Sequence, residues 1–142
     1  MKSITQPDLT LLAFARQAQE RAYAPYSGFR VGAAIYCAGE VTQGVNVENA
    51  AYGSTICAEQ AAATAAVLKG FKIFEAIAIV GDSDDPVVPC GACLQFLSEF
   101  NPQMRIIMGS RGDAVRIATL DELLPEAFAR GLLEEASTSE GS

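Results

Sequence analysis

Three cysteines and one glutamate form the part of this sequence that could do chemistry. Cys90 and Cys93 make a C-x-x-C pair, and Cys57 lies well upstream of them. Three thiolates that converge on Zn²⁺ leave the fourth tetrahedral position open, as in a catalytic site, whereas a structural site is closed by a fourth protein ligand. The pattern therefore predicts a catalytic zinc site held by Cys57, Cys90 and Cys93.

Glu59 lies two residues after the first of these cysteines. Zinc lowers the pKa of a bound water toward neutrality, and a nearby carboxylate can then move protons between that water and a substrate. The chain contains no histidine, so the usual general base is missing. We expect Glu59 to take that role, with an ordinary acidic residue in the first turn of a helix as the alternative.

The remaining cysteine, Cys37, leaves a second interpretation of the metal site open. A structural zinc site would need a fourth protein ligand, and Cys37 is the spare cysteine. It ends an expected strand far from the other three in sequence, where a small buried hydrophobic residue is the simpler interpretation. The acid after Cys57 favours the catalytic site over the structural one.

The motif C-A-E followed by P-C-x-x-C resembles that of the zinc deaminases, in particular the small homotetrameric cytidine deaminases. Three further blocks occur in the same order as in that family, and the similarity extends from about Ala22 to Phe128. The blocks comprise residues 24–34, 46–52 and 123–128.

The resemblance implies one Zn²⁺ per chain and hydrolytic deamination of cytidine and deoxycytidine to uridine and deoxyuridine, in pyrimidine salvage. It also implies a homotetramer with shared active sites. A related alternative is a deaminase of a modified cytosine nucleoside or a nucleoside antibiotic such as blasticidin S. A third hypothesis belongs to a different functional class: the chain would be a non-catalytic zinc-binding or oligomerisation module.

The family resemblance further implies which residues hold the nucleoside. Asn46 and Glu48 would hydrogen-bond the ribose hydroxyls, and alternate positions of an extended segment can point the same way. Phe29 would flank the nucleoside, and the backbone N–H of Ala58 would contact the base. Without the resemblance, Asn46 and Glu48 could equally be polar loop residues.

Two aromatic residues are implied to act between subunits. Phe128 would stack on the base bound by a neighbouring subunit, and Tyr52 would reach a neighbour's site. For either residue alone, packing in the core would be the more common role.

The sequence departs from the family pattern beside both parts of the zinc motif. The family usually has arginine where this chain has Gln60 and Leu94. These arginines donate hydrogen bonds toward the thiolates and offset their charge, so their loss should raise the pKa of a zinc-bound water. We therefore expect a slower chemical step or a shifted substrate preference.

Composition limits the possible partners and the number of domains. The chain has 142 residues, half of them hydrophobic, which predicts one domain over residues 1–134 and a disordered tail over 135–142. The net charge of −7 argues against a nucleic-acid substrate, because phosphate binding needs a basic face. No apolar run reaches membrane-spanning length and no signal peptide is evident, so we expect no membrane partner and a cytoplasmic location.

The order of expected elements indicates an α/β sandwich with a mixed sheet, which the resemblance makes a three-layer α/β/α sandwich with five strands. The two cysteine motifs open helices whose first turns should lie near one another. The expected helices are 7–24, 57–68, 90–100 and 120–125, and the expected strands are 29–37, 41–47, 73–81, 104–108 and 115–119.

Overall fold

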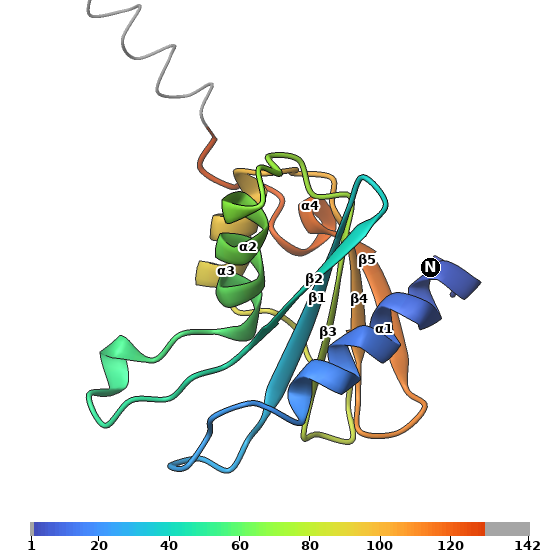
Figure 1. Cartoon of the computed structure of the whole chain (residues 1–142). Coiled ribbons are helices and arrows are strands. Elements are labelled where there is room, and N and C mark those ends of the chain that lie inside the picture. The colour runs from blue at the N-terminus through green and yellow to red at the C-terminus, as the bar shows by residue number, and fades with distance from the viewer. Residues whose placement is uncertain (1, 130–142) are drawn as a thin grey trace, which may run out of the picture.

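A mixed five-stranded sheet forms the centre of the molecule in the computed structural model, which describes residues 2–129 (Figure 1). The strand order is β2-β1-β3-β4-β5. The pair β3–β4 is parallel, and the other neighbouring pairs are antiparallel. The strands are β1 (Val31–Cys37), β2 (Glu40–Val45), β3 (Ala76–Gly81), β4 (Arg105–Gly109) and β5 (Val115–Thr119). The tail predicted over 135–142 lies outside the described residues.

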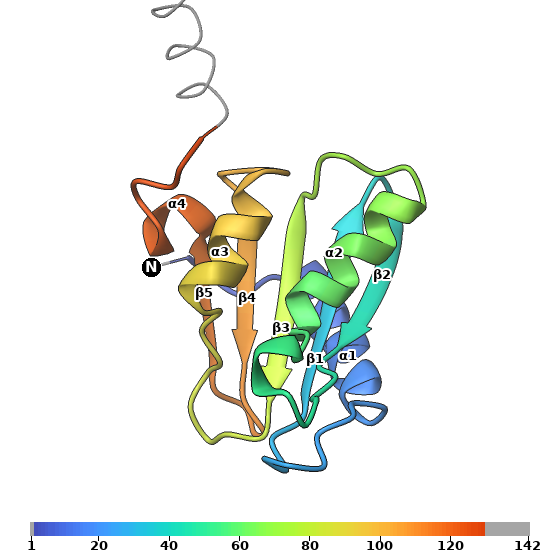
Figure 2. The ribbon, with the colours of Figure 1, turned by 90° about the vertical axis from the view of Figure 1, so that its left-hand side faces the viewer.

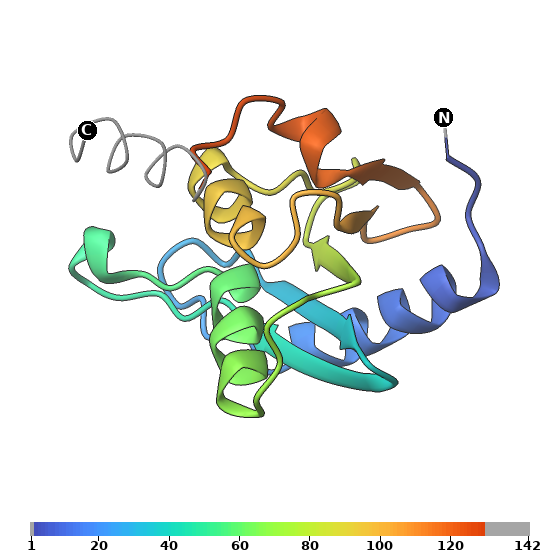
Figure 3. The same ribbon diagram turned by 90° about the horizontal axis from the view of Figure 1, so that it is seen from above.

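Helices cover both faces of this sheet. Helix α1 (Gln6–Gln19) lies on one face, and α2 (Ala58–Leu68), α3 (Gly91–Ser98) and the short α4 (Leu120–Leu123) lie on the other (Figures 1 and 3). The predicted three-layer sandwich is confirmed, and its elements follow the predicted order. Within residues 2–129, no helix is both long enough and apolar enough to cross a membrane.

The first helix is shorter than the sequence predicts. It ends at Gln19 because the following residues pair with a distant segment. The N–H of Tyr23 donates to the carbonyl of Asn46 at 3.0 Å, and the N–H of Glu48 donates to the carbonyl of Tyr23 at 2.9 Å. This pairing draws residues 46–48 alongside the end of α1 and orders the loop between them.

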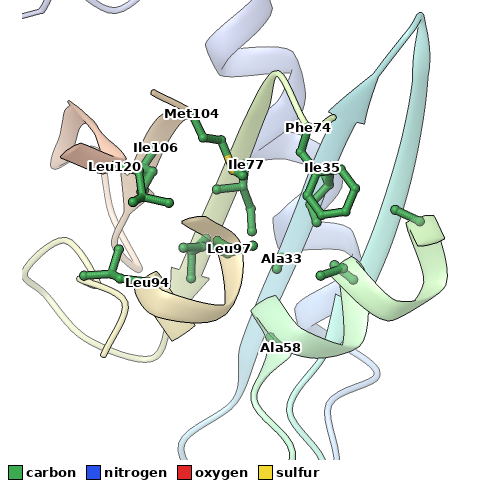
Figure 4. Packing of buried hydrophobic residues seen from close by; sticks show 14 of the residues in the cluster. Ala33, Ile35, Ala58, Phe74, Ile77, Leu94, Leu97, Met104, Ile106 and Leu120 are labelled. Atoms are coloured by element: carbon green, nitrogen blue, oxygen red, sulfur yellow. The ribbon is translucent and has the colours of Figure 1, made fainter. Parts of the chain in front are cut away.

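The hydrophobic core is divided by the sheet into two parts. The larger part lies under α2, α3 and α4 and contains Phe74, Ile77, Leu97 and Ile106 (Figure 4). Cys37 is fully buried within it, which confirms its interpretation as a small hydrophobic residue. The smaller part lies under α1 and includes Leu11, Leu12, Ala15, Ala34 and Ala78.

Helix α2 packs close to the sheet because the residues that face one another at this contact have small side chains or none. Its buried face consists of alanines, and β2 presents Gly44 beneath it. A Cβ atom at Gly44 would lie 2.3 Å from the backbone nitrogen of Ala62. On the opposite face, a Cβ at Gly32 would lie 2.1 Å from the carbonyl oxygen of Ala15 in α1. The absence of a side chain at these two glycines therefore lets one helix on each face approach the sheet closely.

Candidate active site

The three cysteines of the motif converge at the N-terminal ends of two neighbouring helices. Cys57 is the N-cap of α2, Cys90 is the N-cap of α3, and Cys93 lies in the first turn of α3. The two helices lie side by side on one face of the sheet (Figure 2). The three Sγ atoms all lie within 4.8 Å of one another. The predicted convergence is confirmed, and Cys37 is not part of this group.

The chemistry of this sulfur group fits a zinc ion. Burial raises the pKa of the Cys57 and Cys93 thiols, and the charge of Glu59 raises both further. Three thiolates beside a carboxylate therefore need a cation to be stable together. Soft thiolate donors select zinc, and three sulfurs gathered within 4.8 Å of one another could bind one ion. Cys57, Cys90 and Cys93 would hold this ion and leave its fourth position free.

Glu59 lies beside the thiolates in the first turn of α2. Only 6% of the residue is exposed. Burial raises the pKa of its carboxyl group, and a hydrogen bond with Cys93 opposes that shift. A buried carboxyl group with a raised pKa can both accept and return a proton near neutral pH. Its position and burial suit the proton-transfer role expected from the sequence.

Asn46 links the segment after β2 to the start of β1. Its Oδ1 accepts a hydrogen bond from the N–H of Val31 at 2.9 Å, and its Nδ2 donates to the carbonyl of Phe29 at 2.9 Å. One N–H of the amide and one lone pair of its oxygen are left for a ligand. Asn46 therefore positions Phe29 as well as offering polar atoms of its own.

Glu48 is bound to the loop that precedes Phe29. Its Oε1 accepts hydrogen bonds from the backbone N–H groups of Tyr26 and Ser27, both at 3.0 Å, and its Oε2 accepts from the hydroxyl of Ser27. The Ser27 hydroxyl also accepts from the N–H of Phe29 at 2.9 Å. These hydrogen bonds lower the pKa of the Glu48 carboxyl group. Ser27 thus connects Glu48 with Phe29, a role that its place in the motif did not reveal.

The other residues expected to contact the nucleoside lie in different environments. The ring of Phe29 lies over Gly81 and next to Val87, since a Cβ at Gly81 would meet both side chains. Tyr52 belongs to a single 3₁₀ turn, Tyr52–Ser54, at the tip of a segment that projects from the sheet (Figure 1), and it is 84% exposed. Ala58 is fully buried at the start of α2.

Phe128 lies beyond α4 and is 59% exposed. Its backbone is bound to the side chain of Gln95 in α3. The sequence did not single out Gln95, because nothing in the local pattern predicts a contact with a residue so far along the chain.

Gln60 and Leu94 take different positions where the family pattern has arginine. Gln60 is partly exposed in the first turn of α2. Leu94 is 5% exposed and packs in the larger core with Leu97 and Leu120 (Figure 4). The side chain at position 94 therefore contributes to the core and offers no hydrogen-bond donor to the thiolates.

Two cavities in the described part of the chain lie away from the cysteines. One of about 720 Å³ opens between the start of α1 and the sheet, lined by Thr5, Leu11 and Tyr36 among others. The other, of about 480 Å³, is lined by residues of α4 and by Phe128. Neither is lined by Glu59 or the cysteines, and Cys90 is exposed. Of the three cysteines, Cys90 is therefore the one exposed in a single chain, whereas Cys93 is buried.

Comparison with known proteins places this geometry in context. Residues 5–110 match the family described as the cytidine and deoxycytidylate deaminase zinc-binding region. The chain is 42% identical over 129 residues to a cytidine deaminase of Sporosarcina psychrophila, covering 89% of this chain and 95% of the relative. Its fold is similar to the crystal structure of cytidine deaminase from Burkholderia pseudomallei, with a TM-score of 0.83 and 42% identity over 88% of this chain and all of that one.

The chain is also similar to a more distant relative with a different named substrate. A blasticidin-S deaminase of Bacillus cereus is 32% identical over 137 residues, which cover 90% of this chain and 96% of the relative.

Proposed function

This chain belongs to the cytidine and deoxycytidylate deaminase family, and we propose that it hydrolyses cytidine and deoxycytidine to uridine and deoxyuridine with release of ammonia. The observation that carries the proposal is the convergence of three Sγ atoms within 4.8 Å of one another, beside the buried carboxyl group of Glu59. When bound by Cys57, Cys90 and Cys93, zinc supplies the activation of water at neutral pH.

Glu59 moves the protons of the reaction. Its carboxylate accepts a proton from the attacking water and gives it to N3 of the pyrimidine. The oxygen of the water bonds to C4, and Glu59 then takes the second proton from this oxygen and gives it to N4. The C4–N4 bond breaks, the C4 carbonyl forms, and the nitrogen leaves as ammonia. Burial supports this role, because it raises the pKa of the carboxyl group and so makes Glu59 a better proton acceptor.

The nucleoside is held by the segment that joins β2 to the projecting turn. Asn46 and Glu48 receive the ribose hydroxyls, Phe29 lies against the nucleoside, and the N–H of Ala58 contacts the base. Three donors already occupy the Glu48 carboxylate, so its orientation is set before a substrate arrives. This carboxylate and the net charge of −7 both oppose a phosphate group, which favours free nucleosides over nucleic acid.

The active site is completed between subunits of a homotetramer. In the single chain Phe128 and Tyr52 are largely exposed, and Cys90 is exposed as well. A neighbouring copy that supplies these aromatic side chains would cover the base and exclude water from the site. Pyrimidine salvage in the cytoplasm is the physiological context of this proposal.

A second candidate activity is deamination of a modified cytosine nucleoside. The similarity to a blasticidin-S deaminase favours it, as does the absence of arginine at positions 60 and 94. The ratio of kcat/KM for cytidine, deoxycytidine and N4- or C5-modified cytosine nucleosides separates the two activities. A higher kcat/KM for a modified nucleoside than for cytidine would establish the second activity as the principal one.

The first test measures loss of cytidine absorbance and zinc content on the same anaerobically purified sample. We expect about one zinc per chain and conversion of cytidine to uridine. Glu59→Gln keeps the size of the side chain but cannot accept the proton, so kcat should fall by at least about 10²-fold with zinc retained. Glu20→Gln, at an exposed position, is the matched control.

Two results would overturn the proposal. Bound zinc without turnover of any nucleoside, and no change on Glu59→Gln, would identify a non-catalytic zinc-binding module. A protein that lacks zinc yet deaminates cytidine would rule out the cysteine group as the centre of the reaction.

A further inference from the structure

The side-chain amide of Gln95 forms a reciprocal pair of hydrogen bonds with the main chain of Phe128. Nε2 of Gln95 donates to the carbonyl oxygen of Phe128 at 2.8 Å, and the N–H of Phe128 donates to Oε1 of Gln95 at 3.0 Å. The amide thus acts like a residue of a neighbouring antiparallel strand, which exchanges both of its hydrogen bonds with one partner. Only glutamine or asparagine offers a donor and an acceptor in this arrangement.

This pair holds a segment that has no regular structure of its own. Helix α4 ends at Leu123, and residues 127–129 are neither helix nor strand. In the part of the chain that the structure describes, the hydrogen bonds of the Phe128 main chain are the two to Gln95. The ring of Phe128 remains mostly exposed. Gln95 therefore fixes the backbone and leaves the aromatic side chain free for another surface.

Gln95 also lies on the helix that carries part of the sulfur group. It follows Cys93 by two residues in α3, and its other side-chain contact is Ser98 at 3.5 Å on the same helix. The helix that holds Cys90 and Cys93 is thus connected directly to Phe128. Any tilt of α3 would move the backbone of Phe128 with it.

We propose that Gln95 is a positioning residue that presents Phe128 to the active site of the neighbouring subunit. This inference rests on the proposed function, in which Phe128 covers the base bound by another copy of the chain. Gln95 acts on that neighbouring site through Phe128 and touches no substrate. The segment after α4 can then reach across the interface although it is itself neither helix nor strand.

Loss of this pair should weaken substrate binding more than the chemical step. In Gln95→Ala the segment around Phe128 must be ordered when substrate binds. Two neutral hydrogen bonds of ordinary strength correspond to a rise in KM of about tenfold, with kcat changed less than about twofold. Gln95→Glu keeps the acceptor for the Phe128 N–H but loses the donor, so its KM should lie between those of wild type and Gln95→Ala. Ser98→Ala is the control, because it removes the other side-chain contact of Gln95 and leaves the pair intact.

Hydrogen exchange gives a measurement that is independent of activity. The Phe128 amide should exchange about tenfold faster in Gln95→Ala than in wild type, since its acceptor is gone. The amides of β3 in the core should exchange at the wild-type rate. An unchanged rate at Phe128 would overturn the inference, because the pair would then not hold the segment.

Subunit mixing tests whether the effect crosses the interface. Glu59→Gln subunits lack the proton-transfer group but retain an intact Gln95 and Phe128. When they are co-assembled with Gln95→Ala subunits, each working site can receive a well-positioned Phe128 from a Glu59→Gln neighbour. The KM of the mixed oligomers should therefore fall toward the wild-type value. No fall in KM would place the effect of Gln95 within its own subunit and overturn the inference.

Phe128→Ala separates failure of this inference from failure of the proposed function. If Phe128→Ala raises KM and Gln95→Ala does not, the positioning role of Gln95 is wrong and the shared site stands. If Phe128→Ala leaves KM unchanged while cytidine is still deaminated, the shared-site part of the proposed function fails, and the inference fails with it.

Discussion

A substitution at Gly44 in β2 should displace part of the candidate active site, although Gly44 is not one of the site residues. The residue lies beneath α2, and this helix begins with Cys57 at its N-cap and carries Glu59 in its first turn. A methyl group at position 44 would lie 2.3 Å from the nitrogen of Ala62 and 2.6 Å from the carbonyl oxygen of Ala58. Both are backbone atoms, which cannot rotate away. Gly44→Ala therefore has to lift α2 from the sheet.

The size of this displacement follows from the contact distances. Ordinary van der Waals contact begins at 3.4 Å, so α2 must withdraw by about 1 Å. Overpacking of this kind costs about 1–3 kcal/mol of stability. Metal ligands have to keep their distances within about 0.2 Å, and a displacement of about 1 Å in a catalytic group can lower the rate by about 10²-fold. We expect Gly44→Ala to lower zinc affinity and to reduce kcat/KM by about that factor.

Gly32→Ala is the matched control on the other face of the sheet. Its new methyl group would lie 2.1 Å from the carbonyl oxygen of Ala15, so it displaces α1, which carries no candidate site residue. Both variants should lose several degrees of unfolding temperature, since each is overpacked to a similar degree. Only Gly44→Ala should lose zinc at a temperature where both variants are folded, because the zinc ligands lie on the side of the sheet covered by α2 and α3.

The assay combines thermal unfolding, zinc content after gel filtration and cytidine turnover per bound zinc. Reduced stability of Gly44→Ala with normal zinc content and normal kcat/KM would refute the reasoning, because α2 would then not transmit its position to the site. Equal loss of zinc in Gly32→Ala would refute it as well, since the loss would follow from general destabilisation.

Four further changes test other parts of the structure. Asp8 is buried against Arg105, whose Nη2 lies 2.7 Å from the carboxylate, and this pairing lowers the pKa of Asp8. The ion pair stabilises the fold fully at a pH above the pKa that the Asp8 carboxyl group has in the unfolded chain, and this stabilisation is lost as the pH falls through its lower pKa in the folded chain. Urea unfolding should therefore show that wild type loses its stability advantage over Asp8→Asn below about pH 4. Ser27→Ala removes the hydroxyl that joins Glu48 to Phe29, and steady-state kinetics should show KM for cytidine raised about fivefold with little change in kcat; an unchanged KM would exclude Ser27 from positioning. Cys37→Ala should lower the unfolding temperature while metal analysis still finds one zinc per chain, because Cys37 is buried in the core away from the sulfur group. Gln60→Arg restores one cation near the thiolates and should raise kcat and shift the acidic limb of its pH profile to lower pH; identical profiles would contradict the electrostatic role of this position.

Local sequence features were sufficient to predict the order of elements and the residues that could bind metal. The apolar runs that became β3 and β4, and the alanine-rich stretch that became α2, have periodicities that depend on near neighbours alone. Gly70, just beyond the end of α2, takes a positive φ of 96°, which glycine adopts without strain. The cysteine motifs were identifiable because metal ligands are restricted to a few residue types.

Element ends were harder to predict, because they depend on distant partners. Helix α1 was expected to continue to residue 24, but Tyr23 pairs with residues 46–48 instead. Position 94 illustrates the same limit. The motif alone places a residue beside the thiolates there, whereas the fold directs Leu94 into the core.

The sequence by itself determined the donor set, the acid beside it and the class of fold, because these depend on residue type and on short-range spacing. Only the tertiary structure brought the three sulfurs within 4.8 Å of one another, buried Glu59, and joined Ser27 to Glu48 and Gln95 to Phe128. The physical reason is that a hydrogen bond or a metal site depends on distances of a few ångströms. Between residues far apart in the chain, such distances are set by the packing of helices on the sheet.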